Sequence, residues 1–349
     1  MKSNSSKKET EGEVIEGKAR VFQTLVLCHV CRIVVFCFTG QIQEREVEDM
    51  SALRKKFIAL VLLVCLLVPS VYSACYGETA SIYRDAIDSV MDTLRKNDSS
   101  ASNINHQILN GRYRTVQMLE IIAYELDTNG AFDDYISGIM DTLRRNDSSS
   151  SNINQQICNG AYRTVQMLEV IAYELDSSGV YADYIDSVMD TFKSNDSSAS
   201  NINHQILNGT YRTVQLLQVI AYELDTNGVF GAFIDGMMDT LRKNDSSSSN
   251  INQQIVNGVY RTVQMLEVIA LELDSNNIFS DAIDGVMDTF RSNDSSASNI
   301  NHQHLNGVYR TVQLLEIIAY ESIPDSAYVS QGADKNVDMT PDATVDDDL

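Results

Sequence analysis

Apolar residues recur at helical spacing in two kinds of stretch, and both are repeated along the chain. The first kind is represented by Phe132, Ile136, Ile139 and Leu143, which follow one another at four, three and four residues. Residues at this spacing share one face of an α-helix. Acidic residues precede the cationic ones along the stretch, in the order that the helix dipole favours. The pattern predicts an amphipathic helix of about four turns.

The second kind of stretch is longer and passes through an Asn-Gly pair. Its apolar face comprises Ile104, Ile108, Gly111, Thr115, Met118, Ile122 and Leu126. Glycine inside a helix costs about 1 kcal/mol relative to alanine, so two readings compete. Either the helix continues and Gly111 lets a neighbouring helix come close, or Gly111 ends the helix and another begins near Tyr113. The unbroken apolar phase favours one long helix.

Short polar segments separate the two kinds of stretch. Asn-Asp-Ser-Ser follows the shorter one, and we expect it to interrupt the helix as a turn and N-cap. Asp-Thr-Asn-Gly or a similar sequence follows the longer one, where Gly130 and its counterparts are helix-stop signals. Each pair of stretches therefore predicts a helix–loop–helix unit.

These units recur every 49 residues, since near-copies begin at Asn97, Asn146, Asn195, Asn244 and Asn293. A strict period indicates a repeat protein whose copies bury their apolar faces against one another. The predicted fold is all-α, with repeats at residues 81–129, 130–178, 179–227, 228–276 and 277–321. We expect an α-solenoid-like rod or paired helical bundles. Small differences alternate between odd and even copies, which suggests a 98-residue evolutionary pair that packs as a four-helix module.

The two ends of the chain differ from the repeats. Residues 1–49 are interpreted as an N-terminal extension, disordered or not translated in the native protein. Residues 50–73 read as a signal peptide, with three cationic residues, an apolar core and a small-residue exit. The alternative is a signal anchor, which also leaves the repeats outside the cell. Residues 322–349 are predicted to form a disordered acidic tail.

The net charge of the chain indicates which kinds of partner to expect. The formal net charge is −22, and a field of that sign repels a phosphate backbone, so nucleic acid is not an expected partner. Membrane contact is expected only if the signal segment is retained as an anchor. Cations are attracted to such a surface, and loose calcium association is expected although no cofactor is. The Asp-Thr-Asn-Gly turns do not have the EF-hand spacing, because Gly already stands at the fourth position.

No arrangement of residues predicts catalysis. The histidines at 106, 204 and 302 stand 98 residues apart, and no HExxH or cysteine cluster is present. Glu120 and Glu125 accompany Tyr113 and Arg114, but carboxylates five residues apart point about 140° from each other around a helix. They are interpreted as helix-surface ion pairs and packing residues. The chain is not expected to be an enzyme, and no metal or catalytic site is predicted.

Two kinds of covalent modification are candidates. Asn-Asp-Ser and Asn-Gly-Thr are N-glycosylation sequons, found at Asn97, Asn146, Asn195, Asn208, Asn244 and Asn293. Capping explains the Asn-Asp-Ser-Ser segments equally well. Cys75 and Cys158 could form a disulfide, although Cys158 takes a slot that is apolar in other copies and is interpreted as a packing residue.

The sequence thus predicts a non-enzymatic, secreted, acidic helical-repeat protein. Its expected role is extracellular and structural, or one of multivalent interaction, in a matrix, a coat or a mineral-associated layer. Expected partners are other extracellular proteins, matrix, or further copies of itself. The alternative is an extracellular carrier that holds an apolar ligand such as lipid between its helices. A close-packed seam between helices would favour the first reading, and a large apolar cavity the second.

Overall fold

The computed structural model describes residues 83–97, 103–149, 152–198, 201–247, 250–296 and 299–322, all within one compact unit. Within these ranges the only regular secondary structure is helical, as predicted, and there is no strand. The predicted N-terminal extension, the signal segment, Cys75 and the tail beyond residue 322 lie outside them.

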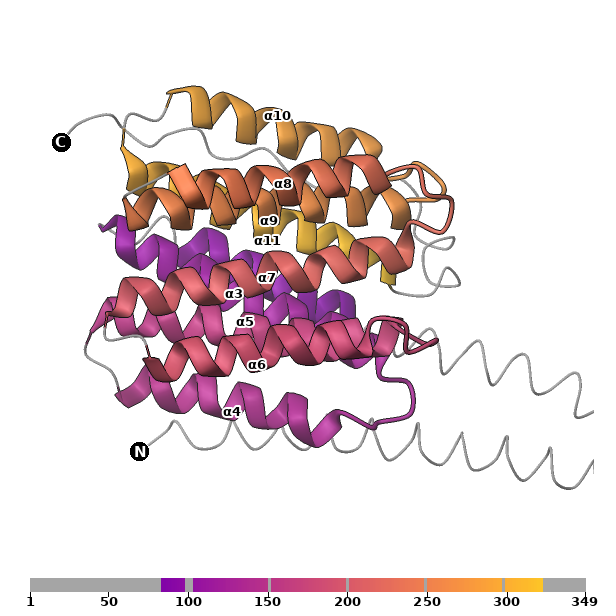
Figure 1. The fold of residues 1–349 in the computed structure, drawn as a ribbon, viewed down its shortest axis with the longest axis horizontal. Coiled ribbons are helices and arrows are strands. Elements are labelled where there is room, and N and C mark those ends of the chain that lie inside the picture. The colour runs from indigo at the N-terminus through magenta and orange to yellow at the C-terminus, as the bar shows by residue number, and fades with distance from the viewer. Residues whose placement is uncertain are drawn as a thin grey trace, which may run out of the picture. The chain divides into compact units, whose positions relative to one another are not determined.

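Long and short helices alternate along the chain (Figure 1). The long helices have 23 residues each and begin 49 residues apart: α3 Ile104–Leu126, α5 Ile153–Leu175, α7 Ile202–Leu224, α9 Ile251–Leu273 and α11 Ile300–Ser322. The short helices have 17 residues each: α4 Asp133–Ser149, α6 Ala182–Ser198, α8 Gly231–Ser247 and α10 Ser280–Ser296. A further helix covers residues 83–97.

The helix boundaries correct one prediction. The short helices continue through Asn-Asp-Ser-Ser, and the long helices begin later, after a different asparagine. Asn103 caps α3, since its Oδ1 accepts a hydrogen bond from the Asn105 amide at 2.9 Å. The same bond recurs at Asn152, Asn201 and Asn250. Asparagine in extended backbone geometry satisfies an otherwise unpaired amide of the first turn. The N-cap of each of these long helices is therefore the first asparagine of an Asn-Ile-Asn sequence.

The turns after the long helices follow the predicted stop signals. Asp127 ends α3, and its carboxylate accepts hydrogen bonds from the amides of Ala131 and Phe132, both at 2.8 Å. Gly130 has a φ of 71°, and Asn277 holds the equivalent place after α9 with a φ of 54°. Glycine and asparagine adopt this left-handed geometry at low cost. One aspartate thus terminates each of the first four long helices and starts the short helix that follows it.

The five long helices form a closed ring. Each packs against the next along the chain, and α11 packs against α3. Each short helix packs mainly against the long helix that follows it and also contacts the one before. The prediction of an open rod was wrong, and so was that of separate pairs, because every neighbouring pair of long helices packs in the same way. Each repeat is rotated by a similar angle relative to the one before it, and five such rotations make a full turn.

The ring is held together by close contacts at the Asn-Gly pairs. A Cβ added to Gly111 of α3 would lie 2.5 Å from Val308 Cγ1 of α11, and one added to Gly307 of α11 would lie 2.5 Å from Val259 Cγ1 of α9. Such distances leave no room for any side chain. The long helix therefore continues through Asn-Gly, as predicted, and glycine is required because a neighbouring helix lies against it.

The side chains that close the ring repeat contacts made inside it. Tyr222 on α7 donates a hydrogen bond to Asp235 on α8 at 2.6 Å, and Tyr320 on α11 donates one to Asp88 at 2.6 Å. Asp88 belongs to the helix at residues 83–97, which stands to α11 as α8 stands to α7. The first short helix therefore completes the last repeat.

The interior of the ring is apolar near the N-terminal ends of the long helices. Ile108, Ile157, Ile206 and Ile255 come from four different long helices and belong to one buried cluster. Further along the helices, Val116 and its counterparts are fully buried. Burial of this kind on every helix supplies the main favourable term for folding.

Candidate functional site

The histidines predicted as polar surface residues do not come together. His106, His204 and His302 are exposed in the first turns of α3, α7 and α11. In the part of the chain that the structure describes, no three His, Cys, Asp or Glu side chains are grouped to hold a metal ion. Cys158 is buried in the apolar cluster of the ring interior, with its Sγ 3.9 Å from Gln205 Oε1.

The glutamates of the long helices face the short helices. Burial raises the pKa of Glu120 to about 7, against the opposing effect of Arg144 on α4. Burial likewise raises the pKa of Glu125 to about 7. Glu169 accepts a hydrogen bond from the Tyr135 hydroxyl at 2.8 Å, and Glu267 forms an ion pair with Arg291 at 3.4 Å. These contacts join one helix to the next and do not form a shared carboxylate pair.

The sequon asparagines lie in helices and not in the loops where we expected them. Asn97 donates a hydrogen bond from Nδ2 to Asn110 Oδ1 at 3.2 Å, and Asn110 in turn donates to the Leu94 carbonyl at 3.1 Å. Asn195 and Asn208 repeat the first of these bonds at 3.3 Å. Asn208 is buried inside α7, so a sugar there would require the folded helix to open. At Asn97, Asn146, Asn195, Asn244 and Asn293 glycosylation stays a prediction.

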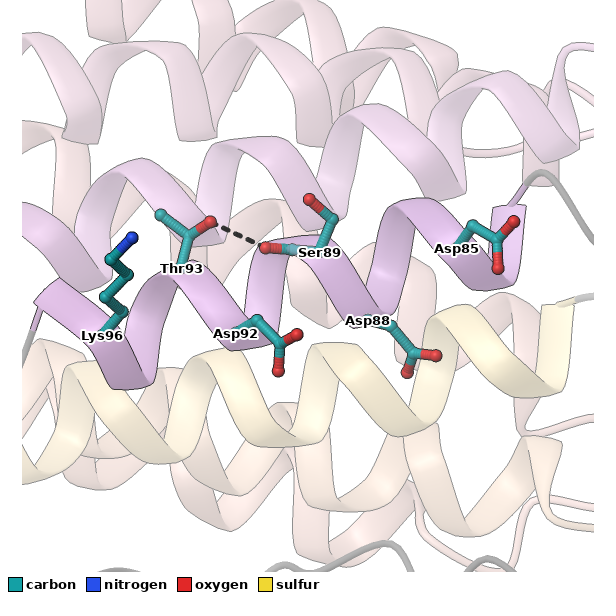
Figure 2. Close-up of a pocket in the computed structure, with 6 residues that line it drawn as sticks. All are labelled: Asp85, Asp88, Ser89, Asp92, Thr93 and Lys96. Carbon is teal, nitrogen blue, oxygen red and sulfur yellow. Dashed lines mark hydrogen bonds between the residues drawn. The ribbon is translucent and has the colours of Figure 1, made fainter.

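An open acidic hollow lies on the first helix (Figure 2). Asp85, Asp88 and Asp92 project from successive turns of residues 83–97, with Lys96 beyond them. Asp88 accepts the hydrogen bond from Tyr320, and Asp92 forms an ion pair with Arg95 at 3.5 Å. The hollow therefore presents negative charge to solvent, and its carboxylates already serve the helix and its neighbour. Loose calcium association remains a prediction for such faces.

Aliphatic side chains stand exposed in the turns that follow the long helices. Val180, Val229 and Ile278 occupy equivalent positions after α5, α7 and α9, with exposed fractions of 72%, 71% and 53%. Ala131 holds the same place after α3. The aromatic residue next to each is more covered: Phe279 is buried, and Tyr181 and Phe230 are half-buried. We call Val180, Val229 and Ile278 the aliphatic rim.

One pair of polar residues interrupts the apolar ring interior. Arg112 stands where the other copies have Ala161, Thr210, Val259 and Val308. His304 stands where the other copies have Ile108, Ile157, Ile206 and Ile255. The Nη2 atom of Arg112 lies 3.3 Å from Nε2 of His304, across the seam between α3 and α11.

The pair is strongly affected by burial. Arg112 is 5% exposed, and desolvation lowers its pKa to about 10. Desolvation, together with the charge of Arg112, lowers the pKa of His304 to about 3. Histidine is therefore neutral at physiological pH, and its Nε2 accepts the hydrogen bond from arginine, which places the ring proton on Nδ1. The result is a buried cation with a neutral partner.

The sequence contained the signal for this pair. The copies, aligned at 49-residue spacing, have one arginine among small uncharged residues and one histidine among isoleucines. The odd–even alternation involves His106 and its counterparts, which are exposed. The polar residues at positions that are uncharged in every other copy, Arg112 and His304, are the ones that meet in the structure.

None of the described helices combines the length and the apolar composition that crossing a bilayer requires. Comparison of the chain with protein-family models, with curated proteins and with solved structures gave no match.

Proposed function

We propose that the chain is a non-enzymatic, secreted, acidic protein that acts outside the cell through several equivalent binding surfaces on one ring. The observation that carries this proposal is the aliphatic rim. A single exposed aliphatic side chain is ordinary on a protein surface, but Val180, Val229 and Ile278 present the same apolar contact point at the equivalent turn of three successive copies. Presentation of one surface several times increases avidity without new contacts.

The acidic short helices add a second element to each surface. Asp85 and Asp88 each have an aspartate counterpart in three of the other four copies, and Asp92 has one in all four. Negative charge next to exposed aliphatic groups suits a partner that is itself basic and apolar. A matrix or coat protein with such segments is the partner class that we propose.

Close packing supports this role over that of a lipid carrier. The Gly111 and Gly307 contacts leave no space at the seams, and Val116, Val165 and Val214 are fully buried. A carrier requires a cavity that accommodates the chain of its ligand.

The test is cross-linking of the full chain expressed in secretory cells. We expect the protein in the medium, starting near Ala74, and cross-linked to basic matrix proteins. Replacing the aliphatic rim by serine (Val180→Ser, Val229→Ser, Ile278→Ser) should abolish most of this cross-linking. A matched control changes the exposed hydroxyl residues of the same turns, Ser177, Thr226 and Ser275, to alanine. Retention in the cell, or equal cross-linking of both variants, would refute the proposal.

A further inference from the structure

The side chain of Arg112 enters the ring interior. Its Cβ lies 3.1 Å from the position that a Cβ on Gly160 would take, so the side chain starts at the seam between α3 and α5. Its Nη2 atom nevertheless reaches His304 on α11, the neighbour on the other side of α3. To extend from the α5 side of α3 to the α11 side by the shortest path, the Arg112 side chain crosses the face of α3 that points into the ring. The guanidinium therefore lies in the layer of Ile108 and its counterparts.

Among the described residues, no carboxylate affects the pKa of Arg112, which burial alone lowers. Burial also lowers the pKa of His304, and the charge that lowers it further is that of Arg112 itself. The Nε atom of Arg112 is sealed from solvent and makes no hydrogen bond. Burying a charge without a counter-charge is among the most costly arrangements in a protein interior. The Nε–H donor of Arg112 therefore calls for an acceptor that carries negative charge.

Side chains at the N-terminal end of the ring are only partly covered. Ile104, Ile153 and Ile202 are half-buried one turn before this layer, and His304 itself is half-buried, whereas its isoleucine counterparts are buried. The five long helices run in one direction, because each short helix brings the chain back. Their N-termini therefore meet at this end, where the helix dipoles favour an anion.

We propose that Arg112 and His304 bind a monovalent anion, a halide or a carboxylate, inside the ring of long helices. The apolar walls favour an anion that loses its hydration shell at low cost. This site is separate from the surfaces proposed above, and either proposal stands if the other fails. It also lies at the one seam that joins the last long helix to the first, so an anion bound there stabilises ring closure.

The test compares the full chain with a variant, Arg112→Val/His304→Ile, that restores the side chains of the other copies. Melting temperatures are measured in sodium fluoride, chloride and bromide at equal ionic strength. The full chain should gain stability in bromide and chloride, saturably and relative to the variant, and fluoride should have the smallest effect. The variant removes the general effect of each salt from the comparison.

Direct binding is measured by the line width of the chloride NMR signal. Protein should broaden the line, and the double variant should lose this excess broadening. Competition with acetate and decanoate then separates the sources, since displacement by decanoate alone indicates an acid with an apolar tail, and displacement by neither indicates a halide site. The proposal would be overturned if halides shifted the melting temperatures of both proteins equally, the full chain caused no excess broadening of the chloride line, and neither acetate nor decanoate changed either measurement.

Discussion

Replacing Gly111 by alanine tests whether the ring is closed in solution. Gly111 touches only the seam between α3 and α11, where an added Cβ would meet Val308 Cγ1 at 2.5 Å. Gly307 makes the same 2.5 Å contact with Val259 at a seam inside the chain. Gly285 lies on the short helix α10, and nothing is found within 4 Å of the position of its Cβ. These three glycines form a matched set.

The expected magnitudes follow from two opposing effects. Alanine is a better helix former than glycine by about 1 kcal/mol, which applies at all three positions. Overpacking of a close contact costs about 1–3 kcal/mol, which applies only at the two seams. Valine is stiff in a helix and cannot rotate away. We therefore expect Gly285→Ala to stabilise the protein, and the two seam variants to be less stable than it by about 1–3 kcal/mol.

The assay is urea unfolding followed by circular dichroism, with the change in the midpoint converted to free energy at constant slope. Val308→Ala in the Gly111→Ala background should recover part of the loss, because it removes the methyl group that the new Cβ meets. The coupling of the two changes in a double-mutant cycle measures the contact itself.

The decisive result is the comparison of the two seams. If the ring is closed, Gly111→Ala and Gly307→Ala lose similar amounts of stability. If Gly111→Ala instead stabilises the protein as Gly285→Ala does, then α3 has no neighbour on that side, and the closed ring is refuted.

Three further outcomes are expected. Arg112→Val/His304→Ile should raise the free energy of unfolding by about 1–4 kcal/mol in buffer without halide, measured by urea unfolding, because a buried charge is replaced by apolar groups. Glu120→Gln, which copies Gln218 of the third repeat, should raise stability above pH 7: the pKa of Glu120 is raised from 4.5 to about 7, so folding is weakened as pH rises through this window. The free energy of unfolding, measured at several pH values, should depend less on pH in this variant than in the unchanged protein. An equal dependence on pH in both proteins would contradict the reasoning. Asn201→Ala should cost about 1 kcal/mol through loss of the cap of α7, seen as a lower urea midpoint.

The helices could be predicted from the sequence because their cause is local. The spacing of Ile104, Ile108 and Thr115 continues through Gly111 without a change of phase, and that continuity outweighed the low helix propensity of glycine. The caps were less predictable. Asn97 and Asn103 both stand before a long helix with short polar neighbours. Only the folded structure, in which Asn97 donates a hydrogen bond to Asn110, shows that Asn103 is the residue that caps α3.

Ring closure could not be predicted, because it depends on the angle between successive copies. That angle depends on close approaches between long helices: a Cβ added to Gly160 would lie 3.1 Å from Arg112 Cβ, and one added to Gly209 would lie 3.2 Å from Ala161 Cβ. Small changes in these approaches, summed over five copies, separate a ring from a rod. The contact between Arg112 and His304 could not be predicted for the same reason. The two residues are 192 positions apart, and they become neighbours only when the ring closes.

The closed ring also limits how the gene can vary. Near-identical tandem copies invite unequal recombination, which removes or adds a whole unit. In an open array such a change shortens or lengthens the protein and leaves each contact intact. Here a chain with four copies would leave one face of α3 and one of the last long helix bare, and it could cover them only with a helix pair taken from another molecule. Copy number is therefore constrained by geometry, and a miscounted allele would be expected to assemble into exchanged oligomers.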